Sequence, residues 1–143
     1  MKRKASAVWN GSGKDGKGKL TTQSGVFQDQ PYSFHTRFEN EDGKAGTNPE
    51  ELIGAAHAGC FAMALSFALN REGYTANELH VDALVHLEKT DAGFHIPKID
   101  LKLFGTVPDI SEEEFMKIAN DAKENCPVSK VLNADITLDA TLK

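Results

Sequence analysis

Two cysteines, far apart in the chain, are the residues best suited to chemistry. Cys60 lies in an uncharged stretch, residues 52–69, and Cys126 stands directly before Pro127. A thiol in a buried helix and a second thiol in a loop or at a helix start are the minimum for two-cysteine redox chemistry. A buried cysteine is usually an inert packing residue, and Cys126 with Pro127 also makes a simple helix end. The residues alone leave both interpretations open.

A reactive Cys60 needs a nearby cation. A thiol attacks a peroxide as the thiolate, and burial alone raises a thiol pKa above its ordinary value of about 8.5. Arg37, between Phe34 and Phe38, is the best candidate, because a guanidinium stays charged when partly buried and can donate to thiolate and peroxide together. An ordinary edge-strand residue is the other interpretation of Arg37. We interpret His57, one helical turn before Cys60, as a core or supporting residue rather than a catalytic base.

A partly buried arginine needs a carboxylate that fixes its direction, and Glu50 is the candidate. Asn48 and Glu51 form a capping-box-like helix start, which accounts for Glu51 and leaves Glu50 without such a role. Ten residues of helix, about 15 Å along the axis, separate Glu50 from Cys60. Glu50 must therefore act through a long arginine or from the partner subunit of an antiparallel helix pair.

Cys126 is expected at the N-cap of a short helix, because Pro127 suits the first helical position. Free N–H groups and the helix dipole at that end stabilise a thiolate. This position suits a resolving cysteine, which attacks the sulfenic acid formed on its partner.

Length and composition limit the function. The chain has 143 residues and a formal net charge of −5. We therefore expect a single globular domain over residues 1–143 and no dedicated nucleic-acid surface, which needs clustered cations. No apolar signal region follows the charged first residues, so we expect a cytoplasmic protein. The uncharged stretch is rich in Ala and Gly and indicates a core helix rather than a membrane span. Neither the cysteines nor the histidine spacing matches a metal site.

Turn and cap residues predict the order strands, helix, hairpin, helix, strand, which defines an α+β fold. A central helix is predicted to begin after Asn48, with Pro49 in its first position, and to stop at Gly73. A second helix starts at Ser111, and Pro127 interrupts it before a short helical turn. The predicted extended segments are residues 4–10, 18–27, 32–38, 79–89, 94–106 and 135–142.

The central helix is predicted to be buried on nearly every side, because residues 52–69 carry no charge. A single small sheet cannot enclose such a helix. Its Ala- and Gly-rich faces permit a second helix to approach closely, so we infer a homodimer with two such helices at its centre.

Four segments carry a resemblance to a known family. They are SGVFQDQPYSFHTRFE, GTNPEELIGAAHAGCFAMALS, KTDAGFHIPKIDLKL and ENCPVSKVLNADITLDATL, and the resemblance extends over essentially the whole length. The sequence resembles the OsmC/Ohr family (osmotically inducible protein C and organic hydroperoxide resistance protein). It is most similar to the OsmC branch, because the arginine falls in FHTRFE just before the helix rather than near the N-terminus.

The resemblance implies a thiol peroxidase that reduces organic hydroperoxides, and hydrogen peroxide less well, in oxidative or osmotic stress defence. Cys60 would be the peroxidatic cysteine and Cys126 the resolving one. Arg37 would stabilise the Cys60 thiolate, and Glu50 would orient that arginine.

The resemblance also implies an intertwined homodimer with antiparallel sheets wrapped around two central helices. It implies no bound cofactor or metal, and an external dithiol, such as a dihydrolipoyl protein, as the reductant. A thiol redox sensor or binding module without turnover is the alternative. A third interpretation is a structural homologue whose cysteines only pack.

Overall fold

The structure is a computed structural model that describes residues 1–143. It divides into two compact units, an N-terminal unit of Met1–Leu52 and a C-terminal unit of Ile53–Lys143. The boundary lies inside helix α2 (Pro49–Arg71). The single domain expected from the chain length stays a prediction.

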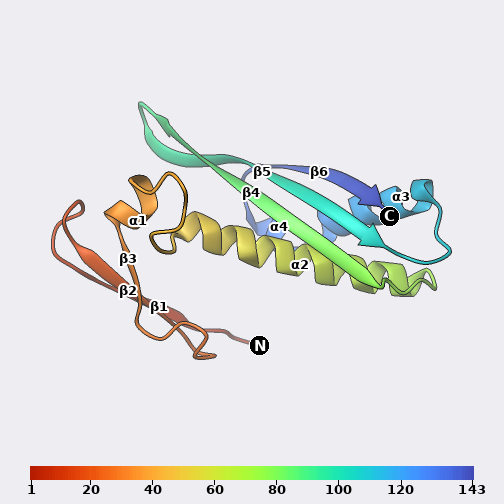
Figure 1. Cartoon of the computed structure of the whole chain (residues 1–143), viewed down its shortest axis with the longest axis horizontal. Helices are drawn as coiled ribbons and strands as arrows, with labels where there is room; N and C mark the ends of the chain where they lie inside the picture. The colour runs from red at the N-terminus through yellow and green to blue at the C-terminus, as the bar shows by residue number, and fades with distance from the viewer. The chain divides into compact units, whose positions relative to one another are not determined.

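The N-terminal unit is built on a small antiparallel sheet with the strand order β1-β2-β3 (Figure 1). Gly18 on the central strand pairs with Trp9 on one side and Tyr32 on the other, and the two rings lie 5.4 Å apart. A Cβ atom at Gly18 would overlap the Tyr32 ring, so this close approach requires a glycine. The strands are β1 (Ala5–Asn10), β2 (Lys17–Thr22) and β3 (Gln30–Ser33).

The predicted third extended segment is correct only up to Ser33, because Phe34–Phe38 form helix α1. The Ser33 hydroxyl accepts from the Thr36 N–H at 3.2 Å, and the Thr36 hydroxyl accepts from the Ser33 N–H at 2.9 Å. This reciprocal capping box satisfies backbone groups at the start of the helix. The phenylalanines at the two ends of α1 lie with their ring centroids 4.9 Å apart. Arg37 is therefore in the last turn of a helix and not on an edge strand.

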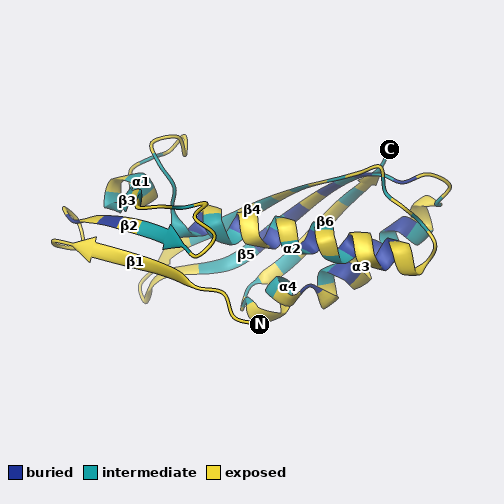
Figure 2. Cartoon of the chain, turned by 90° about the horizontal axis from the view of Figure 1, so that it is seen from below, coloured by how far each residue is buried: buried dark blue, intermediate teal, exposed yellow.

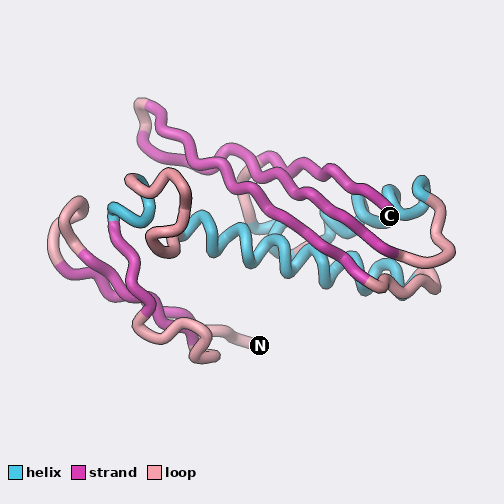
Figure 3. The backbone as a smooth tube through the Cα atoms, in the orientation of Figure 1, coloured by secondary structure: helices cyan, strands magenta, loops and turns pink.

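The C-terminal unit is a three-stranded sheet with helices on one face (Figures 1 and 2). Strand β5 is central: it pairs antiparallel with β4 and parallel with β6. Figure 3 shows β4 and β5 as one long hairpin. The α+β prediction is confirmed. Besides the continuation of α2, the elements are β4 (Glu78–Thr90), β5 (Gly93–Thr106), α3 (Glu112–Asn125), α4 (Pro127–Val131) and β6 (Asp135–Leu142).

The long helices begin and end at the predicted residues. The Asn48 side chain accepts from the Glu51 N–H at 2.8 Å and fixes the start of α2. Gly73 has a φ of +87°, and a backbone hydrogen bond of 2.9 Å closes the helix end beside it. Ser111 caps α3 by accepting from the Glu114 N–H at 3.2 Å.

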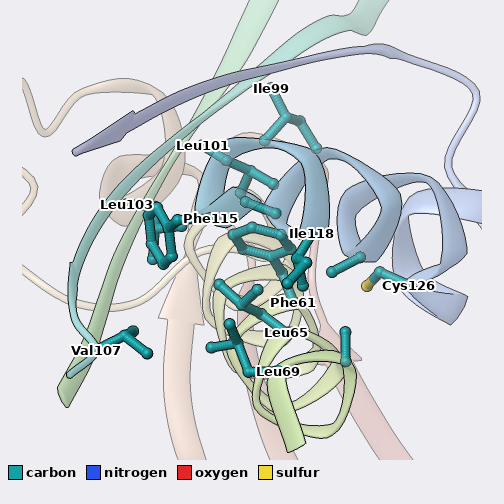
Figure 4. Packing of buried hydrophobic residues seen from close by; sticks show 13 residues of the cluster. Phe61, Leu65, Leu69, Ile99, Leu101, Leu103, Val107, Phe115, Ile118 and Cys126 are labelled. Carbon is teal, nitrogen blue, oxygen red and sulfur yellow. The ribbon is translucent and has the colours of Figure 1, made fainter. Parts of the chain in front are cut away.

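The core of the C-terminal unit lies between the sheet and helices α2 and α3. Alternate residues of β5 point into it, while the intervening ones point to the other face of the sheet. Each fully buried Leu, Ile or Phe contributes about 1.5–3 kcal/mol relative to an exposed one. Cys60 packs at the margin of this core. The core residues labelled in Figure 4 are Phe61, Leu65, Leu69, Ile99, Leu101, Leu103, Val107, Phe115, Ile118 and Cys126.

The other side of α2 is exposed in the single chain. Met63 is 64% exposed and Phe67 is 61% exposed, so the expected burial on nearly every side is wrong for one chain (Figure 2). By length and composition alone, α2 could also cross a membrane. The core helix of a soluble protein has the same properties, and the buried side of α2 packs against its own sheet.

Candidate functional site

The two cysteines meet within the C-terminal unit. Cys60 lies in the middle of α2 and is partly buried, while Cys126 lies between α3 and α4 and is fully buried. Both are free thiols, and their side chains lie close enough for each to shift the pKa of the other. Figure 4 shows Cys126 at the edge of the core, at the end of α3. The predicted pairing of a helix thiol with a distant second thiol is therefore present as a contact.

The surroundings of the two sulfurs shift their thiol pKa values in opposite directions. Burial raises the pKa of the Cys60 thiol, the contact with Cys126 raises it further, and the Val128 N–H only partly offsets this. Burial also acts to raise the pKa of Cys126, but the Ser129 N–H, the Cys60 thiol and the Ser129 side chain outweigh it and lower that pKa. With these contacts alone, the first thiolate of the pair forms on Cys126.

Cys126 is the N-cap of α4, as predicted, with Pro127 in the first helical position. The backbone N–H groups of Val128 and Ser129 face the cysteine pair and favour a thiolate. The Cys126 sulfur makes no ordinary N-cap hydrogen bond, so these N–H groups act at longer range. They remain available to a charge that forms during the reaction.

His57 is buried, as its interpretation as a core or supporting residue expects, but its contact with α4 was not predicted from the sequence. Its Nε2 lies 2.8 Å from the Ser129 Oγ, and the residue is completely buried. Burial lowers the pKa of His57, so the imidazole is neutral. Its Nδ1 has no hydrogen-bond partner. The sequence could have indicated that Ser129 lies near Cys126, because it follows Cys126 by three residues in a helical turn. It could not indicate the contact with His57, which is 72 residues away in the chain.

Arg37 and Glu50 form an ion pair within the N-terminal unit. Arg37 Nη2 lies 2.6 Å from Glu50 Oε1, and Arg37 Nε lies 3.2 Å from both carboxylate oxygens. Glu50 is only 8% exposed, in the first turn of α2, and the guanidinium also lies 4.8 Å above the Phe38 ring. The carboxylate fork and the ring hold the guanidinium in one direction, as expected for a positioned cation.

The four predicted site residues thus form two pairs, each within its own unit. Cys60 contacts Cys126, and Arg37 contacts Glu50. The role of Arg37 in stabilising the Cys60 thiolate stays a prediction. The structure holds no group of three or more His, Cys, Asp or Glu side chains that could bind a metal ion.

Comparisons with known proteins give the relatives of this chain. The family model described as OsmC-like protein matches residues 41–141. Peroxiredoxin OsmC from Escherichia coli (strain K12) is 54% identical over 141 residues, which make up 99% of this chain and 96% of that protein.

Solved structures share the fold. The crystal structure of the organic hydroperoxide resistance protein OhrB of Bacillus subtilis has a TM-score of 0.71 at 27% identity, over 96% of this chain and 98% of that chain. An OsmC-like protein of unknown function from Vibrio cholerae has a TM-score of 0.76 at 15% identity, over 99% of each chain, and this likeness concerns the fold alone. The resemblance found in the sequence is confirmed, and the chain belongs to the OsmC-like protein family.

Proposed function

We propose that this protein is a cysteine-based thiol peroxidase that reduces organic hydroperoxides, and hydrogen peroxide less well, in stress defence. One observation carries the proposal: two free thiols, from α2 and from the start of α4, are neighbours within the C-terminal unit. The names of two relatives, Peroxiredoxin OsmC and organic hydroperoxide resistance protein OhrB, support the same chemistry.

The reaction consumes one hydroperoxide and two thiols. The Cys60 thiolate attacks the terminal peroxide oxygen, the O–O bond breaks, and the leaving alkoxide takes a proton to become an alcohol. Cys60 is then a sulfenic acid. The Cys126 thiolate attacks the Cys60 sulfur, the S–O bond breaks, and the leaving hydroxide takes a proton to become water. An external dithiol reduces the resulting disulfide by exchange and is itself oxidised to a disulfide.

Arg37 supplies the cation that Cys60 lacks among its contacts in the C-terminal unit. Its Nε and Nη2 are held by Glu50, which leaves the Nη1 hydrogens for a thiolate and a peroxide oxygen. In this role Arg37 reverses the order of ionisation, so that Cys60 becomes the thiolate that meets the hydroperoxide. Glu50 fixes the direction of the guanidinium and has no contact with the substrate.

A homodimer completes the proposal. The exposed side of α2 carries Met63 and Phe67 together with small Ala and Gly residues. A second copy of α2 can cover this surface. We place the protein in the cytoplasm, where free thiols persist and a dithiol reductant such as a dihydrolipoyl protein is available. No bound cofactor or metal enters the reaction as written.

Steady-state consumption of cumene hydroperoxide with dihydrolipoamide as the electron donor tests the proposed function. Many turnovers per chain are expected, with tert-butyl hydroperoxide also consumed and hydrogen peroxide consumed more slowly. Oxidation of the two thiols without turnover, although the donor reduces the disulfide, would instead identify a redox sensor. No reaction of either thiol would leave the cysteines a packing role only.

A further inference from the structure

The buried His57–Ser129 pair connects the two elements that carry the cysteines. His57 lies one turn before Cys60 on α2, and Ser129 lies one turn after Cys126, on α4. The 2.8 Å contact between Nε2 and Oγ therefore lies beside the thiol pair. A fully buried histidine with a single hydrogen-bond partner is unusual enough to require an explanation.

The tautomer of His57 follows from its Nδ1 atom, which has no hydrogen-bond partner. The neutral imidazole carries one N–H, on Nδ1 or on Nε2. A proton on Nδ1 would leave a buried N–H donor without an acceptor, since Nδ1 has no partner. The proton is therefore on Nε2 and is donated to the Ser129 hydroxyl oxygen. The Ser129 hydroxyl hydrogen is then free to be donated onward.

The acceptor for that hydrogen is the Cys126 sulfur. Cys126 is the N-cap of α4 and Ser129 is the third residue of that helix, two positions whose side chains lie next to each other. The Ser129 side chain and the Ser129 N–H both act to lower the pKa of Cys126. Donation runs in one direction, from His57 through Ser129 to Cys126. A hydroxyl that also receives a hydrogen bond is a stronger donor, because hydrogen bonds in a chain polarise one another.

We propose that His57 and Ser129 form a hydrogen-bond relay that holds Cys126 as a thiolate for disulfide formation. The proposal rests on the proposed function, since it concerns the resolving step of the same dithiol. In that step the Cys126 thiolate forms the S–S bond to the Cys60 sulfenic acid, and hydroxide leaves and takes a proton from solvent. Ser129 touches the reacting sulfur, and His57 is a positioning residue that acts through it.

A purely structural pair would behave differently from a relay. If His57 and Ser129 only clamp α2 to α4, their loss lowers the melting temperature and leaves the acidity of Cys126 unchanged. If they form a relay, their loss raises the pKa of Cys126, because the thiolate loses a donor. Glutamine at position 57 separates the two cases, since its amide can donate to Ser129 whereas phenylalanine cannot.

The first test measures the pKa of Cys126 without any hydroperoxide. In a Cys60→Ala background, the ultraviolet absorbance of the thiolate is followed against pH. Ser129→Ala and His57→Phe are each expected to raise this pKa by about one unit, and His57→Gln is expected to restore most of it. His95→Phe, an exposed histidine replaced in the same way, is the control and is expected to leave the value unchanged.

The second test follows the Cys60 sulfenic acid in the two-cysteine protein after one equivalent of cumene hydroperoxide. Below the Cys126 pKa, a rise of one unit lowers the thiolate population about tenfold but raises its nucleophilicity, so disulfide formation slows about three- to fourfold. Formation of the Cys60 sulfenic acid is timed in the same experiment, so that the rate of disulfide formation is measured separately from it.

An unchanged Cys126 pKa in Ser129→Ala, or in a folded His57→Phe, would overturn the relay. This outcome is distinct from failure of the proposed function, because the titration needs no turnover. Ser129→Ala removes only one oxygen atom, so its Cys126 pKa tests the relay even if His57→Phe does not fold.

Discussion

At the scale of single residues, the central feature is the unequal acidity of the two thiols. Burial and Cys126 raise the pKa of Cys60, whereas donors at the start of α4 lower the pKa of Cys126 despite its burial. The peroxidatic role of Cys60 therefore depends on a cation outside these contacts. Arg37 is that cation in our proposal, and its ion pair with Glu50 is the reason it can keep one direction.

Serine substitutions separate the roles of the cysteines. Cys60→Ser is expected to abolish hydroperoxide consumption, because serine has no accessible anion at neutral pH. Cys126→Ser is expected to permit one turnover and then to accumulate sulfinic acid on Cys60, since no thiolate traps the sulfenic acid. Mass spectrometry of the cysteine peptides distinguishes the two, and sustained cycling by Cys126→Ser would refute its resolving role.

Arg37→Lys is expected to lower kcat/KM about 10- to 100-fold, although the charge is kept. A lysine cannot hold the Glu50 carboxylate with two N–H groups and donate to the thiolate at the same time. Rates are measured with limiting cumene hydroperoxide at several pH values, and the pH at which Cys60 ionises is expected to rise. The exposed Arg71, the last residue of α2, serves as the control: Arg71→Lys is expected to react at the wild-type rate.

At the scale of the elements, one carboxylate links the three strands of the C-terminal sheet. Asp100 at the centre of the C-terminal sheet accepts from His86 of β4 at 2.7 Å, from the Thr137 hydroxyl of β6 and from Lys98 of its own strand at 2.7 Å. These contacts lower the pKa of Asp100 well below its usual range, with Lys98 as the largest cause. The carboxylate thus connects all three strands.

Asp100→Asn is expected to lower the free energy of unfolding at neutral pH. The free energy of unfolding of the variant is also expected to depend less on pH in the acid range. A carboxylate with a depressed folded pKa stabilises the fold fully above its unfolded pKa, about 3.9, and the stabilisation is lost progressively as pH falls from that value towards the folded pKa. The difference between the denaturant midpoints of wild type and variant is therefore expected to be largest at pH 6 and to shrink steadily below about pH 4. A constant difference at every pH would contradict the linkage.

Much of this element layout was predictable, because cap and turn residues act locally. Asn48, Gly73 and Ser111 fix helix ends through contacts within a few residues, and β6 was predicted with its observed bounds. Helix α1 was missed because a short segment of alternating apolar residues fits both the helical and the strand repeat. The capping box of Ser33 favours the helix. The His57–Ser129 contact was missed because only the folded chain brings these residues together.

At the scale of the whole molecule, one chain leaves an apolar side of its longest helix in contact with water. Met63 and Phe67 are both more than half exposed on a helix whose opposite side is fully buried. Charged residues are absent from this part of α2. The simplest cover is the same surface of a second copy, which is the homodimer expected from the sequence.

Phe67→Asp is expected to convert the dimer to a monomer, because it places an unpaired charge in the proposed interface. Sedimentation velocity at several concentrations measures the change, and the melting temperature is expected to fall with it. Leu84→Asp is the matched control, since Leu84 is also 61% exposed but lies on the opposite face of the sheet from the core, as its alternation in β4 indicates. Dimers in both variants, or monomeric wild type, would contradict the proposed interface.

The most direct test of the central claim is a single-turnover stoichiometry. Reduced protein is mixed with one equivalent of cumene hydroperoxide, and the alcohol, the remaining thiols and the linked peptides are quantified. One alcohol is expected to form and two thiols are expected to be lost per chain, with Cys60 and Cys126 joined in a disulfide. Alcohol formation without that disulfide, or intact thiols beside unreacted hydroperoxide, would contradict it.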